Sequence, residues 1–198
     1  MPVKAYFVQY KFILPKETKH SSYTYQKLFR AIYGYTQNVS KGGGKVYKYH
    51  RKGVLSDVPY LRPGKNCVLI PPSAFNKLIT FLKTGKNPTH FWRVKGDWKA
   101  VYYMDEKQLS ENEAVSALED LASRLYVDSS EGSLKLSDFI SLASETQRKS
   151  PGSKAIEDLA VKDAEAVVNC EWFKETHSAS GKLTSFLENY KKLKQKSG

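Results

Sequence analysis

The hydrophobic residues of the first 33 positions change their spacing from every second residue to every third or fourth. A period of two places alternate side chains on opposite faces of a strand, and a period of 3.6 places them on one face of a helix. The strand pattern covers residues 3–14 and carries Tyr6, Val8, Tyr10, Phe12 and Leu14 on one face. The helical stripe carries Tyr25, Leu28, Phe29, Ile32 and Tyr33, and Gly34 is its stop signal. We therefore expect a strand that packs against a helix.

Short apolar runs and turn residues continue this alternation. We predict strands at residues 45–51 and 67–70, a helix capped by Ser73, and a β-hairpin at residues 90–104. Ser110 and Glu113 form a capping box, which predicts the start of another helix. The order β-α-β-β-α-β-β-α predicts an α+β fold: an antiparallel or mixed sheet with packed helices, followed by a small C-terminal helical region.

The composition changes after Tyr126, which indicates a domain boundary. Residues 128–133 are rich in Ser and acids and are typical of a linker. Three helical patterns follow, near residues 136–147, 154–170 and 180–194. We predict an α+β domain at residues 1–127, a linker at 128–133, and at 134–198 a helical region for packing, dimerisation or partner contact. The last pattern has a narrow apolar stripe, formed by Leu183, Phe186, Leu187, Tyr190 and Leu193.

Positive charge and aromatic rings are concentrated in the same part of the chain. Residues 1–105 hold 19 of the 25 aromatic residues, and 19 Lys and Arg against four acids, a formal charge of +15. Residues 106–198 hold 13 bases and 16 acids, a charge of −3. Cations neutralise phosphates, and flat rings offer unpaired bases a surface on which to stack. We therefore expect the N-terminal part to bind nucleic acid.

Other features limit the class of protein. No run of about 18 apolar residues is present, and the N-terminus lacks the apolar core of a signal peptide. Two cysteines are too few for a disulfide framework or a Cys-based zinc site. The basic residues are dispersed and do not form one amphipathic helix, which argues against membrane binding. We expect a soluble, intracellular protein of the cytoplasm, nucleoid or nucleus that needs no cofactor or metal.

The strand after Gly42-Gly43-Gly44 combines both kinds of side chain on one face. A period of two gives the order base, ring, ring, base: Lys45, Tyr47, Tyr49 and Arg51. Rings in this arrangement can stack on bases while the cations reach phosphates. The alternative is that the tyrosines fill a core and the cations are solvated. Lys41 and Lys48 flank this face and can add phosphate contacts.

The expected hairpin at residues 90–104 has a similar face. If Gly96-Asp97 is a two-residue turn, one side carries Phe91, Arg93, Lys95, Trp98 and Tyr102. The other side has only one charge and resembles a core face. A shift of the turn by one residue exchanges the two faces and replaces Trp98 by Trp92.

Catalytic residues are harder to identify. Asp97-Trp98-Lys99 matches a fragment of metal-dependent nucleases, but it lacks the clustered carboxylates that bind a divalent ion. A metal-independent ribonuclease needs a general base, a general acid and a nearby cation, which His50 and its neighbours can supply. A third alternative is a scaffold subunit of a ribonucleoprotein or replication complex.

The sequence thus predicts a non-catalytic protein that binds single-stranded DNA or RNA by aromatic stacking and phosphate contacts. For the C-terminal helices, the sequence favours packing within the chain, and a second copy or a protein partner is the alternative. The expected nucleic-acid contacts are Lys41, Lys45, Tyr47, Lys48, Tyr49, Arg51, Phe91, Arg93, Lys95, Trp98 and Tyr102.

Overall fold

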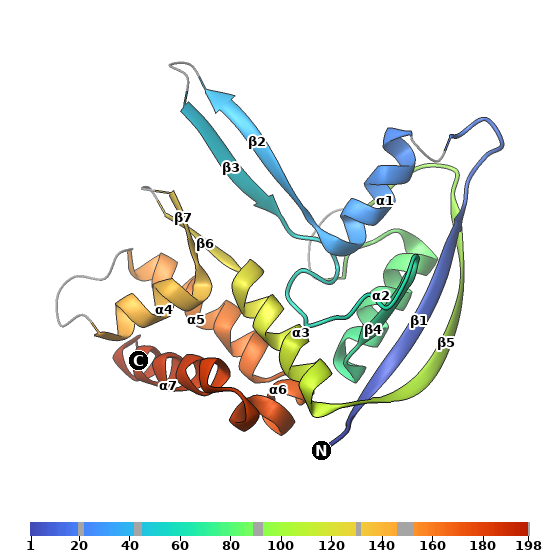
Figure 1. Cartoon of the computed structure of the whole chain (residues 1–198). Helices are drawn as coiled ribbons and strands as arrows, with labels where there is room; N and C mark the ends of the chain where they lie inside the picture. Colours follow the sequence, from blue (N-terminus) through green and yellow to red (C-terminus); the bar gives the residue numbers. More distant parts are fainter. Residues whose placement is uncertain (20–21, 42–44, 89–92, 130–131, 146–152, 198) are drawn as a thin grey trace. The chain divides into compact units, whose positions relative to one another are not determined.

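The computed structural model describes residues 1–19, 22–41, 45–88, 93–129, 132–145 and 153–197. The chain forms two compact units (Figure 1). We call Lys4–Gln108 the N-terminal unit, and Met1–Val3 together with Leu109–Gly198 the C-terminal unit. Helices and antiparallel strands occur together, so the predicted α+β class is confirmed.

A three-stranded sheet forms the centre of the N-terminal unit. Its middle strand is β1 (Val3–Ile13), which lies between β4 (Cys67–Ile70) and β5 (Lys99–Leu109). β1 pairs with β4 in antiparallel fashion, with Tyr6 opposite Ile70 and Val8 opposite Val68. From Val8 to Ile13 the side chains of β1 alternate between buried and exposed positions, with Val8, Tyr10 and Phe12 on the core face. At the start of the strand the opposite parity is buried, through Val3 and Ala5. The strand predicted at residues 3–14 is therefore confirmed.

Two helices cover the buried face of this sheet, as Figure 1 shows. They are α1 (Tyr23–Tyr33) and α2 (Pro72–Thr84). The predicted helix ends are confirmed, because Gly34 and Gly85 follow α1 and α2 with φ angles of 76° and 70°. The predicted cap of α2 is wrong by two residues: Pro71 is the capping residue and Pro72 takes the first helical position. Proline suits that position because its missing N–H has no helical partner there.

A separate hairpin consists of β2 (Tyr35–Lys41) and β3 (Lys45–Arg51). The strand predicted at residues 45–51 is confirmed as β3. Its partner β2 was not predicted, because its sequence is polar and has no buried face to impose an apolar alternation. Among the described residues, the apolar core takes none from this hairpin.

The hairpin predicted at residues 90–104 is wrong in its described part. Its second arm exists as β5, but β5 pairs with β1. Arg93 instead forms an isolated bridge to Lys86, and residues 94–98 lie outside strands. A long-range pairing with the central strand has replaced the local one, which sequence spacing alone does not reveal. Residues 89–92 lie outside the described part.

The C-terminal unit is mainly helical. Its first helix, α3 (Glu111–Arg124), begins at Ser110 with the predicted capping box. The remaining elements are β6 (Tyr126–Ser129), β7 (Gly132–Lys135), α4 (Leu136–Glu145), α5 (Lys154–Val168), α6 (Glu171–Thr176), a 3-10 turn (His177–Ala179) and α7 (Gly181–Ser197).

The boundary between the units differs from the predicted one. It follows Gln108, so α3 belongs with the C-terminal helices instead of the basic domain. The described part of the expected linker at residues 128–133 belongs to β6 and β7, which pair with each other. The Ser-rich and acidic composition of residues 128–133 therefore belongs, in its described part, to a polar hairpin within the C-terminal unit.

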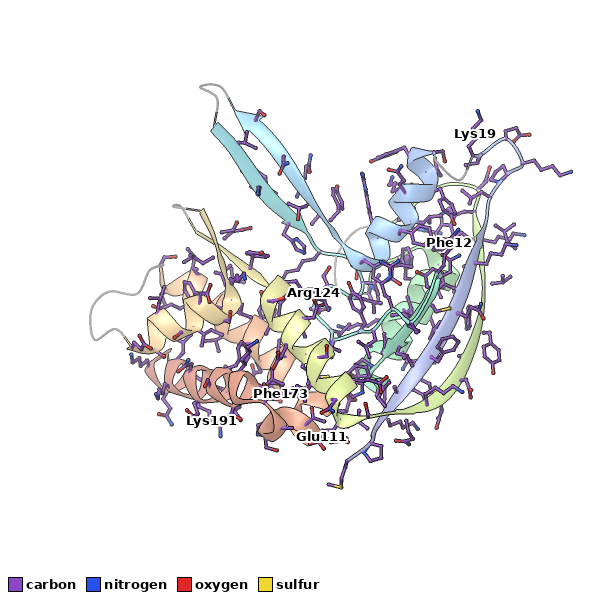
Figure 2. All side chains as sticks on the ribbon, viewed as in Figure 1. Phe12, Lys19, Glu111, Arg124, Phe173 and Lys191 are labelled. Atoms are coloured by element: carbon purple, nitrogen blue, oxygen red, sulfur yellow. The ribbon has the colours of Figure 1, made fainter. Side chains whose placement is uncertain are left out.

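The C-terminal unit has its own apolar core. Trp172 and Phe173 are fully buried, and the α7 stripe contributes Leu183, Phe186 and other residues to the same unit. Figure 2 shows Phe173 among the helices, whereas Lys191 lies on the outer side of α7. The α7 stripe thus packs within the chain, which leaves the expected contact with a second copy to other surfaces of these helices.

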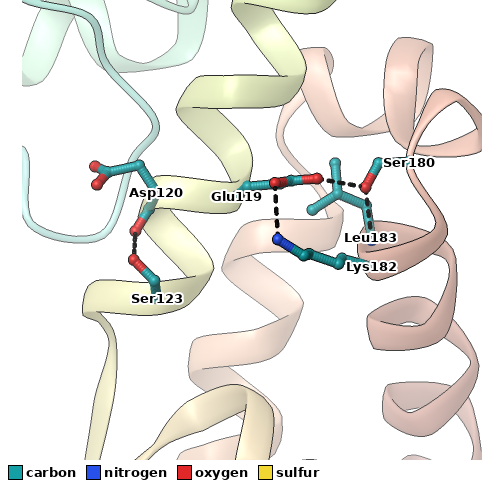
Figure 3. Close-up of polar contacts among 6 residues, drawn as sticks. All are labelled: Glu119, Asp120, Ser123, Ser180, Lys182 and Leu183. Carbon is teal, nitrogen blue, oxygen red and sulfur yellow. Dashed lines mark hydrogen bonds and ion pairs between the residues drawn. The ribbon is translucent and has the colours of Figure 1, made fainter.

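A polar contact joins α3 to the start of α7 (Figure 3). Ser180 donates a hydrogen bond to Glu119 (Oγ–Oε1 2.7 Å), and Lys182 lies 3.4 Å from the other carboxylate oxygen. The Ser180 hydroxyl also accepts a hydrogen bond from the backbone N–H of Leu183. Hydrogen bonding from Ser180 lowers the pKa of Glu119, because it favours the ionised carboxylate.

We predict that Glu119→Gln lowers the free energy of unfolding by about 1 kcal/mol at pH 7, because it removes the charged acceptor. Since the pKa of Glu119 is lowered in the folded protein, its contribution is present above the ordinary value of 4.5 and disappears as the pH falls below it. Urea titrations at pH 7 and pH 3.5 measure this. Glu188→Gln, at an exposed position of α7, is the control and should change stability by less than about 0.5 kcal/mol. An equal loss in both variants would contradict the prediction.

Candidate nucleic-acid interface

A cleft of about 600 Å³ lies in the N-terminal unit between α1, the base of the β2–β3 hairpin and residues 93–94. We call it the Arg30 cleft. Among the described residues of its lining, five are Lys or Arg and none is Asp or Glu. It is lined by Tyr23, Lys27, Arg30, Ala31, Tyr35, His50, Arg51, Lys52, Arg93 and Val94. Such a lining favours an anionic ligand that also carries flat groups.

Helix α1 supplies one wall through its regular spacing. Tyr23, Lys27 and Arg30 are four and three residues apart, so they share one side of the helix. The opposite side carries Leu28 and Ile32, which are fully buried in the core. Burial of the apolar stripe thus turns the tyrosine and both cations toward the cleft.

Arg30 lies near two aromatic rings. Its guanidinium carbon is 5.1 Å from the centre of the Tyr35 ring and 6.0 Å from that of Tyr23. Both distances fall within the range of cation–π attraction. The rings therefore help to orient a planar group that can donate two parallel hydrogen bonds to a phosphate.

The base of the hairpin is attached closely to α1. The backbone N–H groups of Val54 and Leu55 donate to carbonyls of α1, at 2.9 and 2.8 Å. At Gly34 a Cβ atom would lie 2.5 Å from the Ser56 hydroxyl and 2.7 Å from the Arg51 carbonyl, so only glycine fits. Because β2 starts directly after Gly34, this close approach fixes where Tyr35 and Arg51 enter the cleft.

The hairpin register brings several predicted contacts together. Tyr35 pairs with Arg51 and Gln37 with Tyr49, so these four side chains share one face. Arg51 donates from Nε to the Gln37 amide oxygen at 3.3 Å. Lys41, Lys45 and Tyr47 lie in the paired strands, but their side chains lie outside the described part. The described half of the predicted face is thus continuous with the Arg30 cleft through Tyr35 and Arg51.

The other face of the hairpin is polar. It carries the exposed Lys48 and, at the cleft, His50, whose Nδ1 lies 3.4 Å from the Thr36 hydroxyl. The structure thus places the residue on which the ribonuclease alternative depends beside the predicted binding residue Arg51.

Trp98 occupies a different environment from the predicted stacking platform. Its ring packs on the core, 5.7 Å from Phe12 and 5.9 Å from Phe81, and its Nε1–H donates to the Val94 carbonyl. Tyr102 also packs partly against the core, whereas Arg93 and Lys95 are exposed. Phe91 and Trp92 lie outside the described residues. Trp98 therefore stabilises the core through Phe12 and Phe81. Arg93 lines the Arg30 cleft.

Of the lining residues, only Arg51 and Arg93 were predicted contacts. The tyrosines and cations that the prediction missed are Tyr23, Lys27, Arg30, Tyr35 and Lys52. Three of them, Tyr23, Lys27 and Arg30, share the side of α1 that faces away from its buried stripe, and no binding contact was predicted there. A signal was present in the sequence, since a tyrosine and two cations share that side without an acid.

The net charge of the N-terminal unit makes the field at this cleft more positive. The N-terminal unit has 20 Lys and Arg against five Asp and Glu, a net charge of +15, and the C-terminal unit has −3. Three of the five acids are engaged in ion pairs: Asp57 with Lys77, Asp105 with Lys107 and Glu106 with Lys4. Their charges are therefore neutralised locally and do not oppose an anion in the cleft.

Within the described residues, no three His, Cys, Asp or Glu side chains are grouped so that they could hold a metal ion. The described helices include none with the length and apolarity needed to cross a membrane. The chain matches no protein-family model, no curated protein and no solved structure. Its function must therefore be argued from the cleft itself.

We predict that Gly85→Ala destabilises the N-terminal unit by at least about 2 kcal/mol. An added Cβ would meet the Val94 carbonyl at 2.7 Å and the Trp98 ring at 2.9 Å, and the φ angle of 70° disfavours alanine. Gly64→Ala is the matched control, because a Cβ there has no atom within 4 Å. Urea denaturation followed by tryptophan fluorescence measures both. Equal stability of the two variants would show that Trp98 does not pack over Gly85.

Proposed function

We propose that the N-terminal unit binds single-stranded DNA or RNA without cleaving it. The observation that carries this proposal is the Arg30 cleft, where five cations and two tyrosines line one cavity without a carboxylate. The cations release counterions from the phosphates, and the rings offer stacking surfaces that every base can use.

The exposure of the rings supports a single strand as the ligand. Tyr23 is 67% exposed and Tyr35 is 37% exposed, although both are large and partly apolar. Bases within a duplex are stacked on each other and do not offer their faces to tyrosine, whereas unpaired bases do. Each stacked base contributes about 1–3 kcal/mol. Duplex is the competing ligand, because a two-stranded ribbon such as β2–β3 also fits a major groove.

Two other functions stay as alternatives. His50 lines the cleft beside Arg51 and Lys52, an arrangement that a metal-independent ribonuclease requires in part. A scaffold subunit of a ribonucleoprotein or replication complex would use the same basic cleft only within its assembly, with a protein partner on the C-terminal unit. We propose an intracellular location, such as the cytoplasm, nucleoid or nucleus, where nucleic acid is accessible.

We predict that Arg30→Lys weakens the binding of single strands about five- to tenfold, although the charge is unchanged. Lysine lacks the planar fork that lies near the rings of Tyr23 and Tyr35. Fluorescence anisotropy with labelled single-stranded and duplex DNA and RNA, at low and moderate salt, measures the affinities.

Lys16→Ala, at an exposed position that does not line the cleft, serves as the control and should change affinity by less than about twofold. Tighter binding of duplex than of single strands, or equal effects of the two substitutions, would reject the proposed mode of recognition. Binding of every probe that vanishes at moderate salt would indicate counterion release alone.

For the ribonuclease alternative, we predict that the wild-type protein leaves labelled RNA intact in the presence of EDTA. The described residues that line the cleft include one histidine and no carboxylate, so one imidazole would have to serve both as the general base and as the general acid. Gel electrophoresis of the RNA measures this. Cleavage that disappears in His50→Ala would establish the ribonuclease in place of the non-catalytic protein.

A further inference from the structure

A second cavity of about 620 Å³ adjoins the Arg30 cleft. We call it the Lys99 groove. It has four cations and no carboxylate in its lining. The lining consists of Leu82, Lys83, Thr84, Arg93, Val94, Lys95, Gly96, Trp98, Lys99 and Ala100. The end of α2, the segment 93–98 and the start of β5 thus form a second electropositive surface.

The two cavities meet at a common wall. Arg93 and Val94 line both of them. The two cavities share no other described lining residue. Val94 is buried, whereas the side chain of Arg93 is exposed. Arg93 is therefore the point at which an extended ligand in one cavity would pass into the other.

The wall is held by several independent contacts. The Val94 N–H donates to the Gly85 carbonyl at 2.9 Å, and the Trp98 indole donates to the Val94 carbonyl at 3.3 Å. The Trp98 ring is anchored in turn against Phe12 and Phe81. Arg93 therefore projects from a segment whose backbone is fixed to the core, which lowers the entropy lost when a ligand binds.

The cations of the Lys99 groove have no internal neutralisation. In the described ranges, none of Lys83, Arg93, Lys95 and Lys99 forms a salt bridge. Four like charges around one cavity repel each other, and the repulsion is relieved when a polyanion enters. Among the described residues of its lining, Trp98 is the one aromatic residue, and its ring packs on the core. We therefore assign to this groove contact with phosphates.

We propose that one nucleic-acid strand occupies both cavities: its bases stack in the Arg30 cleft, and its backbone continues past Arg93 along the Lys99 groove. This inference rests on the proposed function and extends it. It assigns two different tasks, because the described lining of the first cavity includes the exposed rings of Tyr23 and Tyr35, whereas that of the second includes four cations and a tryptophan that packs on the core. The Lys99 groove should therefore matter only for strands long enough to reach it.

The test is a length series of labelled oligo-dT and oligo-U, from about four to about 16 nucleotides, which spans common site sizes. The variant is Lys95→Ala/Lys99→Ala, which removes two exposed cations and leaves the lining of the Arg30 cleft intact. The control is Lys16→Ala/Lys19→Ala, which removes the same charge from exposed positions outside both cavities.

We expect the Lys95→Ala/Lys99→Ala variant to bind the long strands about tenfold more weakly and the shortest strands as the wild type does. Each lost phosphate contact should also reduce the slope of log affinity against log salt by about 0.7, and only for the long strands. The control should show neither effect.

Two outcomes would overturn the inference in different ways. If the variant binds long strands as the control does while Arg30→Lys still weakens binding, the strand does not enter the Lys99 groove and the proposed function stands. If neither variant changes binding, or no oligonucleotide binds at any length, the proposed function fails and the inference fails with it.

Discussion

The packing of the Phe12 ring is the contact on which the binding surface depends. Phe12 lies on the buried face of β1, with the ring of Phe29 from α1 at 5.4 Å and the ring of Trp98 at 5.7 Å. Through Phe29 it positions the helix that presents Arg30, and through Trp98 it positions the segment that carries Arg93. One cluster of aromatic rings in the core therefore holds both walls of the cleft.

Charge segregation gives this scaffold its chemical character. The boundary between the units follows Gln108, and it coincides with the change from a net charge of +15 to −3. A unit with so much positive charge loses stability through self-repulsion, which an anionic ligand offsets. Three of the five acids of the N-terminal unit form ion pairs outside the cleft lining. The cations of α1, the hairpin base and Arg93 therefore meet in the cleft without a carboxylate among its described lining residues.

Aromatic residues serve two separate purposes in the N-terminal unit, and exposure distinguishes them. Trp98, Phe81 and Phe12 form the interior, where burial of apolar area stabilises the fold. Tyr23 and Tyr35 lie at the surface beside Arg30, where the proposed ligand would stack on them. An aromatic-rich composition therefore indicates nucleic-acid binding only after the core rings have been set aside.

Hydrophobic periodicity was sufficient to predict β1, α1, α2, the capped start of α3 and the α+β class, because each of these elements buries a regular apolar stripe. It missed β2 and the β6–β7 hairpin, whose polar strands carry no such stripe, and it paired residues 90–104 with each other. The face shared by Tyr49 and Arg51 also followed from the sequence, since strand alternation is local. Only the tertiary structure decided that α1 and Arg93 join Arg51 in one cleft and that Trp98 supports it. These residues are far apart in the chain: Arg51 follows Arg30 by 21 residues, and Arg93 follows Arg51 by 42. Burial in a common core, which no local spacing encodes, brings their segments together.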